Sequence, residues 1–299
     1  MDFWKAAMAA TLCCMGTGAV WAQGTHGDAD IGAIANISAE NVVEAAQLVR
    51  EGKVYALGVV TGRDTPVWGE RAYDIEVSRL GPFGNVTGHD EKLTSHLGIG
   101  TQIDGFGHVG VDGIHFGGVP REDFAHPDGL TRFGIESIPP IATRGVLIDM
   151  ARHFGVETLE PRASFGSADI QAASAAQGVR IGRGDVVLLH MGWLAMEGDP
   201  ELFVGAQPGI DEEGARWLAE LGVVAVGSDS PGLETTGGDG SGGFIPVHVA
   251  LLAEHGVHIL ESINTSQLAA DEAWEFLFVL GAPRFEGAVQ GVVNPVAIR

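Results

Sequence analysis

Four side chains that can bind a metal ion or move a proton lie close together near residue 100. They are His96, Gln102, Asp104 and His108, and glycines separate them. If residues 101–108 are roughly extended, Gln102, Asp104 and His108 fall on one face, because their positions differ by even numbers. A carboxylate, an imidazole and an amide on one face are donors that suit a divalent metal ion. The same residues also fit a polar turn whose side chains only satisfy backbone groups.

Two further candidates lie in the second half of the chain. His248 falls in the first turn of a predicted helix, behind the glycine-rich loop 237–243. Glu261 falls inside the apolar strand VHILESI, and burying an unpaired carboxylate is costly. A metal ion or an ion pair would compensate this charge. The other interpretation is a strand residue that faces solvent.

The composition is that of a globular protein with a substantial core. The chain has 299 residues, of which 45% are hydrophobic and 19% charged. Its formal net charge of −22 argues against nucleic acid and anionic membranes as partners. No P-loop, no GxSxG elbow and no GxGxxG motif that opens a helix occurs in it, so nucleotide-binding and serine-hydrolase sites are disfavoured.

The first 22 residues have the pattern of an export signal. A basic start precedes an apolar run, 6–20, and a small-residue end before the predicted cleavage near Ala22. The run is too short to favour a membrane span. Cys13 and Cys14 both lie in the signal, so the mature chain would contain no cysteine. We expect a periplasmic or secreted protein that leaves the membrane after cleavage. A lipoprotein signal at Cys13 is the alternative.

The elements that must position the candidates alternate between strands and helices. A helix that Ser38 caps, running to about residue 50, comes first. The other predicted elements are strands at 53–60, 74–80, 144–150, 185–191, 223–228, 257–263, 276–280 and 292–298 and helices at 167–177, 211–221 and 247–255. This order predicts an α/β architecture with at least part of its sheet parallel. We expect a signal at 1–22, a flexible lead-in at 23–37 and one domain with a mixed sheet at 38–299.

Residues 112–140 have little periodicity and are rich in Gly, Pro and His. This composition favours a long functional loop or lid. From it, His115, Phe116 and His126 could reach a ligand, and Trp68, in an earlier loop, could line a pocket. Surface positions for the histidines and core packing for the tryptophan are the alternatives.

Several ordered motifs from about residue 53 to the C-terminus resemble those of the cyclase-like metal-dependent hydrolases. Residues 98–108, GIGTQIDGFGH, are similar to the motif HxGTHxDxxxH. GDVVLL and GW at 184–193 resemble the strand GDVVLL…TGW of the family. The segments 208–230 and 248–263 are similar to its PG…A.WL…VG.D and H..LL…ILE.L segments.

This resemblance implies a swivelling β/β/α fold, a homo-oligomer such as a dimer or tetramer, and a Zn²⁺ or Mn²⁺ site. By position, Asp104, His248 and Glu261 would bind the metal. His108 would transfer a proton or serve as a further ligand; we expect the proton transfer.

The chain departs from the motif at its two earlier histidines. Gly98 stands at the first position and Gln102, a weaker ligand, at the second. His96 would replace the first histidine if the glycines let the chain fold back. The departures favour one metal ion over two, with Gln102 and His96 as further ligands.

We therefore expect an exported metal-dependent hydrolase that opens a small cyclic amide or lactone, or cleaves a related small amide. The alternative is a periplasmic small-molecule-binding protein of the same fold that has lost its catalytic metal. A lyase or dehydratase that uses the same metal is a third possibility.

Overall fold

The computed structural model describes residues 30–236 and 245–299. The predicted export signal, residues 23–29 of the predicted lead-in and the glycine-rich loop 237–243 lie outside the described residues.

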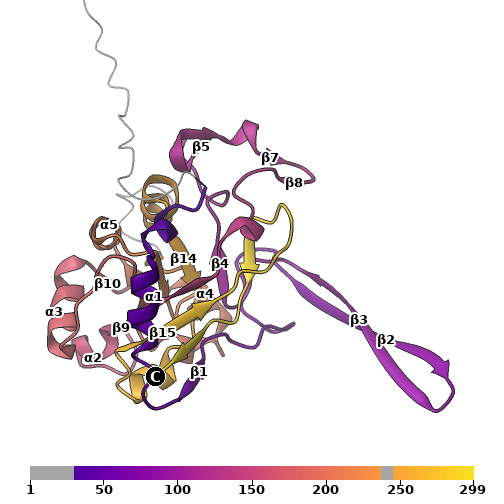
Figure 1. Ribbon diagram of the computed structural model, residues 1–299, viewed down its shortest axis with the longest axis horizontal. Helices are drawn as coiled ribbons and strands as arrows, with labels where there is room; N and C mark the ends of the chain where they lie inside the picture. The colour runs from indigo at the N-terminus through magenta and orange to yellow at the C-terminus, as the bar shows by residue number, and fades with distance from the viewer. Residues whose placement is uncertain (1–29, 237–244) are drawn as a thin grey trace, which may run out of the picture.

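A mixed sheet of nine strands forms the centre of the fold (Figure 1). In spatial order, its strands are β1 (Val54–Ala56), β17 (Val296–Ile298), β15 (Glu275–Leu280), β9 (Ile141–Asp149), β11 (Val186–His190), β13 (Ala225–Ser228), β14 (His258–Glu261), β4 (Gln102–Asp104) and β16 (Gln290–Val292). The four middle strands, β9, β11, β13 and β14, run parallel, and the strands beyond them on both sides pair antiparallel. The predicted α/β architecture with a mixed sheet is therefore confirmed.

The parallel strands are buried on both faces, which explains their nearly continuous apolar sequences. In β11, Val187 and Leu189 pack into one core, whereas Val186 and Leu188 pack into a second core on the opposite face of the sheet. Charged or strongly polar side chains in these strands are consequently exceptions that need a partner.

Helices lie on both sides of the sheet. In the described residues they are α1 (Ala39–Ala46), α2 (Met150–Phe154), α3 (Ser167–Gln177), α4 (Pro200–Gly205), α5 (Glu212–Leu221), α6 (Pro246–His248), the π-helix η6 (Val249–His255) and α7 (Ser266–Ala270). Apolar residues of α3, α5 and η6 pack in the core that contains Val187, and Leu268 of α7 packs in the core that contains Leu188. None of the described helices is long and apolar enough to cross a membrane.

The capping residues in the sequence predicted correctly where most of the expected helices begin. Ser38 caps α1 with a capping box, and the Asp211 side chain caps α5. The prediction that α1 continues to about residue 50 was wrong, because the helix ends at Ala46. The predicted helix 247–255 is an α-helical turn that passes into a π-helix. The predicted strand at 53–60 is confined to β1.

Residues 112–140 contain short elements instead of one open loop. They are the hairpins β5 (Ile114–His115) with β6 (Val119–Pro120) and β7 (Ala125–His126) with β8 (Gly129–Leu130), and the turns η2 (Phe116–Gly118), η3 (Arg121–Asp123) and η4 (Ile135–Ser137). The remaining short elements are η1 (Ala33–Asn36), η5 (Trp193–Met196), and the parallel pair β10 (Ser164–Phe165) and β12 (Gly209–Ile210).

A long hairpin extends away from the body of the molecule (Figure 1). It consists of β2 (Tyr73–Phe83) and β3 (Val86–Ser95), and we call it the arm. Only its first strand was predicted, because β3 has the polar sequence VTGHDEKLTS, which gives no apolar alternation.

Candidate metal centre

The pairing register of β14, β4 and β16, at one edge of the sheet, brings four polar side chains to one face. Gln102 lies opposite Glu261, and Asp104 lies opposite Gln290. Ile103 packs in the core that contains Leu188, so its two neighbours in β4 point to the opposite face. There the sheet presents two carboxylates and two amides, all at most 9% exposed.

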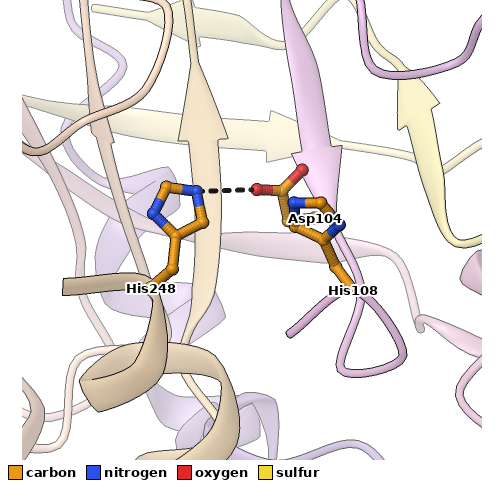
Figure 2. Close-up of side chains that lie close together, drawn as sticks. All are labelled: Asp104, His108 and His248. Carbon is orange, nitrogen blue, oxygen red and sulfur yellow. Dashed lines mark ion pairs between the residues drawn. The ribbon is translucent and has the colours of Figure 1, made fainter. Parts of the chain in front are cut away.

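His248 reaches this face from α6. Its Nε2 atom lies 3.6 Å from Oδ2 of Asp104 and 3.2 Å from Oε1 of Glu261. Figure 2 shows its ring pointing toward Asp104 across the gap between α6 and β4. The prediction that Glu261 needs a partner is confirmed, because Glu261 is only 4% exposed and contacts His248. The interpretation that it faces solvent was wrong.

A third buried carboxylate, Glu234, fixes the orientation of His248. Its side chain accepts a hydrogen bond from the backbone N–H of Val247 at 2.9 Å and contacts Nδ1 of His248. Because Nδ1 is held by Glu234, Nε2 is the nitrogen that faces the other carboxylates. Glu234 was not among the predicted residues. It lies in an irregular segment after β13, where spacing gives no signal.

The two amides join the carboxylates. Nε2 of Gln102 donates to Oε2 of Glu261 at 2.6 Å and to Oδ1 of Asp104 at 3.3 Å. Nε2 of Gln290 donates to the same Oδ1 at 2.7 Å and lies 3.4 Å from Nε2 of His108. Gln290, which sequence analysis missed, therefore connects Asp104 with His108.

His108 follows the short turn after β4 and is half-buried. Its ring centre lies 6.0 Å from that of His248, and donor atoms of these two histidines and Asp104 all lie within 4.8 Å of one another (Figure 2). The structure thus brings His108 to the site, at a distance that suits either a proton carrier or a metal ligand.

The electrostatics of the cluster are strongly coupled. Burial by itself would raise the pKa of Asp104, but His108 and His248 outweigh it and lower that pKa to about 2. Burial and the charge of Asp104 raise the pKa of Glu261 to about 7. Burial disfavours a charged His248, yet the nearby carboxylates of Asp104, Glu234 and Glu261 raise its pKa well above the usual value. The carboxylates therefore favour a positive charge between them.

The donor set fits a divalent cation. Oδ2 of Asp104 is buried and accepts no hydrogen bond from any described residue, although a buried carboxylate oxygen normally has a partner. Nε2 of His248 and Oε1 of Glu261 face the same region. An imidazole nitrogen and two carboxylate oxygens form a ligand set typical of Zn²⁺ and Mn²⁺.

Two residues predicted as metal ligands, His96 and Gln102, do not direct a ligand atom to the region between Asp104, His248 and Glu261. His96 is exposed at the base of the arm, and its Nδ1 accepts a hydrogen bond from the backbone N–H of Ala72 at 2.9 Å. The structure therefore does not bring His96 to the cluster. Gln102 is in the cluster, but it turns its Nε2 and not its oxygen toward the carboxylates.

The other side chains that were expected near a ligand range from buried to exposed. Trp68 is half-buried, and its Nε1 donates to the carbonyl of Pro231 at 3.1 Å. Nδ1 of His115 contacts the carbonyl of Phe106 at 2.9 Å, Phe116 packs in the core, and His126 is exposed.

Comparison with known proteins identifies the family. The profile of the Cyclase family matches residues 55–235, which is more than half of the chain. The chain therefore belongs to the Cyclase family, and the predicted relationship is confirmed. No curated protein matches its sequence significantly.

Solved structures have the same fold. The crystal structure of a novel cyclase is 26% identical, with a TM-score of 0.82, and the match covers 90% of this chain and 96% of that one. Isatin hydrolase A from Ralstonia solanacearum is 19% identical, with a TM-score of 0.63 and coverage of 86% and 96%. A predicted metal-dependent hydrolase from Bacillus stearothermophilus is 18% identical, with a TM-score of 0.54 and coverage of 82% and 97%. The chain thus has the fold of the cyclase-like metal-dependent hydrolases.

Proposed function

We propose that the protein is an exported metal-dependent hydrolase that opens a small cyclic amide or lactone, or cleaves a related small amide. The observation that carries the proposal is the convergence of Asp104, His248 and Glu261 on one buried region in a chain of this family. These three residues are the proposed ligands of one divalent ion, Zn²⁺ or Mn²⁺.

A bound divalent ion would act as a Lewis acid, which lowers the pKa of a water molecule and polarises a substrate carbonyl. His108 takes a proton from the attacking water and returns it to the leaving nitrogen or oxygen. The new C–O bond forms at the carbonyl carbon, and the C–N or C–O bond breaks. The products are a carboxylic acid and an amine or alcohol, which remain on one molecule when a ring is opened and separate when an acyclic amide is cleaved. Glu234 keeps His248 in the orientation that the ligand role needs.

One observation favours the alternative of a binding protein without a catalytic metal. Gln102, Gln290 and His248 already contact the carboxylates of Asp104 and Glu261, so the charges have partners within the chain. The two functions differ in metal content and in turnover.

A substrate screen tests the proposal. Lactones, isatin-like cyclic amides, N-formyl anilines and imides would be incubated with the mature protein and Mn²⁺ or Zn²⁺. We expect metal-dependent ring opening or deformylation of at least one class. Binding of these compounds without turnover in the metal-loaded protein would support the binding protein instead.

Export and self-association are further parts of the proposal. The sequence of residues 1–22 supports export, and mass analysis of the N-terminus of secreted protein tests it: we expect a start near Gln23, and an intact Met1 would contradict it. The arm supports a homo-oligomer, because a two-stranded hairpin is only marginally stable in water without a covering surface. Val77, on the arm, is 67% exposed within one chain.

A further inference from the structure

Arg71 and Gln290 fill the space in front of Gly98. A Cβ atom built on Gly98 would lie 2.5 Å from Oε1 of Gln290 and 2.9 Å from Nη1 of Arg71, so both groups face one point. Nη1 of Arg71 also donates to the carbonyl of Gly98 at 2.6 Å. The missing side chain at position 98 is therefore what lets a guanidinium and an amide approach the segment between β3 and β4 together.

Gln290 connects this point to the candidate metal centre. The other end of its amide donates to Asp104 at 2.7 Å and lies 3.4 Å from Nε2 of His108. A single amide thus lies between the guanidinium and the cluster. The positive charge of Arg71 also affects the cluster. Burial is the main cause of the lowered pKa of His108, and the charge of Arg71 lowers this pKa further.

The guanidinium of Arg71 has unused donors. The side chain is half-buried, and among the described residues its one hydrogen bond is to the carbonyl of Gly98, with no carboxylate as partner. A guanidinium has five N–H donors in a planar fork that matches a carboxylate. Burial raises the pKa of Glu261 and the charge of Arg71 lowers it, but among the described residues the guanidinium has no hydrogen bond to a carboxylate. In a chain with a net charge of −22, these donors are available for an anionic ligand.

Contacts of the backbone hold Arg71 in place. Its N–H donates to the carbonyl of Trp68 at 3.4 Å, and the indole of Trp68 donates to Pro231 at 3.1 Å. His108 and Arg71 are half-buried, whereas Asp104, His248 and Glu261 are buried. A ligand that reaches the cluster from solvent therefore approaches on the side of His108 and Arg71.

We propose that Arg71 binds a carboxylate group that the substrate carries in addition to the bond that is cleaved, so that the site selects small anionic substrates. The choice of substrate rests on the proposed function, but carboxylate binding itself requires no turnover and can be measured separately.

Isothermal titration calorimetry with benzoate and benzamide tests this inference, using the full mature protein both loaded with Mn²⁺ and treated with EDTA. Benzoate should bind about 10- to 100-fold more tightly than benzamide, the usual effect of a hydrogen bond to a charged group. Arg71→Met should remove this preference and leave benzamide binding unchanged. Arg71→Lys should keep part of it, because lysine retains the charge without the fork.

Two further variants make the experiment specific. Arg63→Met is the control, because Arg63 lies in the same loop but pairs with Asp74 at 2.6 Å on the surface; it should bind benzoate like the wild type. Gly98→Ala should weaken benzoate binding without removing the arginine, because the new Cβ displaces Arg71 or Gln290.

The outcomes separate this inference from the proposed hydrolase. Unchanged benzoate affinity in Arg71→Met, or equal loss of benzoate and benzamide binding, would overturn the role of Arg71 while leaving the hydrolase intact. A protein that shows Arg71-dependent benzoate binding but holds no metal and has no turnover would contradict the hydrolase alone.

Discussion

Glu234 contacts Nδ1 of His248, and Nε2 of the same ring faces Asp104 at 3.6 Å. The imidazole is thereby held between carboxylates, with Glu234 on the side of Nδ1 and Asp104 and Glu261 on the side of Nε2. A carboxylate that fixes the far nitrogen of a ligand histidine sets its tautomer and its direction. Glu234 is therefore a positioning residue for the candidate metal centre.

Replacing Glu234 should weaken metal binding without abolishing it. Glu234→Gln removes the charge that orients His248, and loss of such a partner usually lowers metal affinity about 10- to 100-fold. Competition with a fluorescent chelator would measure the affinity for Zn²⁺. Glu254→Gln is a matched control on η6, because Glu254 pairs with Arg216 away from the site. Equal affinities in the Glu234→Gln variant and the wild type would refute the positioning role.

The two roles open to His108 predict different losses. If His108 carries protons, His108→Ala should keep its metal and its substrate affinity and lose about 10²- to 10⁴-fold in kcat. Metal analysis and steady-state kinetics on the same preparation measure both. A metal-depleted His108→Ala protein whose activity returns with added Mn²⁺ or Zn²⁺ would make His108 a ligand instead.

Sequence patterns predicted the central strands because these strands are buried on both faces and leave long apolar runs. The resemblance to the family motifs also selected Asp104, His108, His248 and Glu261, which the structure brings together. Whether they bind a metal stays a prediction. For Glu261 the argument was physical, since a carboxylate in an apolar strand needs a partner, and His248 is that partner.

The remaining site residues gave no local signal. Gln290 joins the site only because β16 pairs with β4, which places it opposite Asp104, 186 residues earlier in the chain. Glu234 and Arg71 lie in irregular segments. His96 was wrongly grouped with its neighbours in sequence, because the strand β3 ends just before it and leaves it exposed at the base of the arm. Pairing between distant strands cannot be inferred from spacing within one segment.

The arm should mediate self-association through one of its faces. Val77 shares a face with Ile75 and Leu93, whereas Ser78 lies on the opposite face, opposite Asp90. Val77→Lys should therefore convert an oligomer into a monomer, as measured by size-exclusion chromatography with light scattering, and Ser78→Lys should not. A monomeric wild-type protein, or equal behaviour of both variants, would argue against this interface.

A histidine outside the site should make stability depend on pH. Burial disfavours the charged form of His190, but Asp229 overcomes this effect and raises its pKa. A raised pKa in the folded state means that the stabilisation is complete below the unfolded value of about 6.5 and is lost as the pH rises through the folded value. His190→Gln should thus lower Tm more at pH 6 than at pH 9, with exposed His126→Gln as the control. An equal loss at both pH values would contradict this assignment.

Metal content tests the central claim most directly. Elemental analysis of the purified mature protein, after incubation with Zn²⁺ or Mn²⁺ and removal of the excess, should find about one metal ion per chain. Asp104→Ala should lose it, because Asp104 supplies a buried oxygen that no described residue satisfies, while Asp128→Ala, which changes an exposed carboxylate, should retain it. A wild-type protein that binds no metal, or full occupancy in Asp104→Ala, would contradict the proposed metal centre.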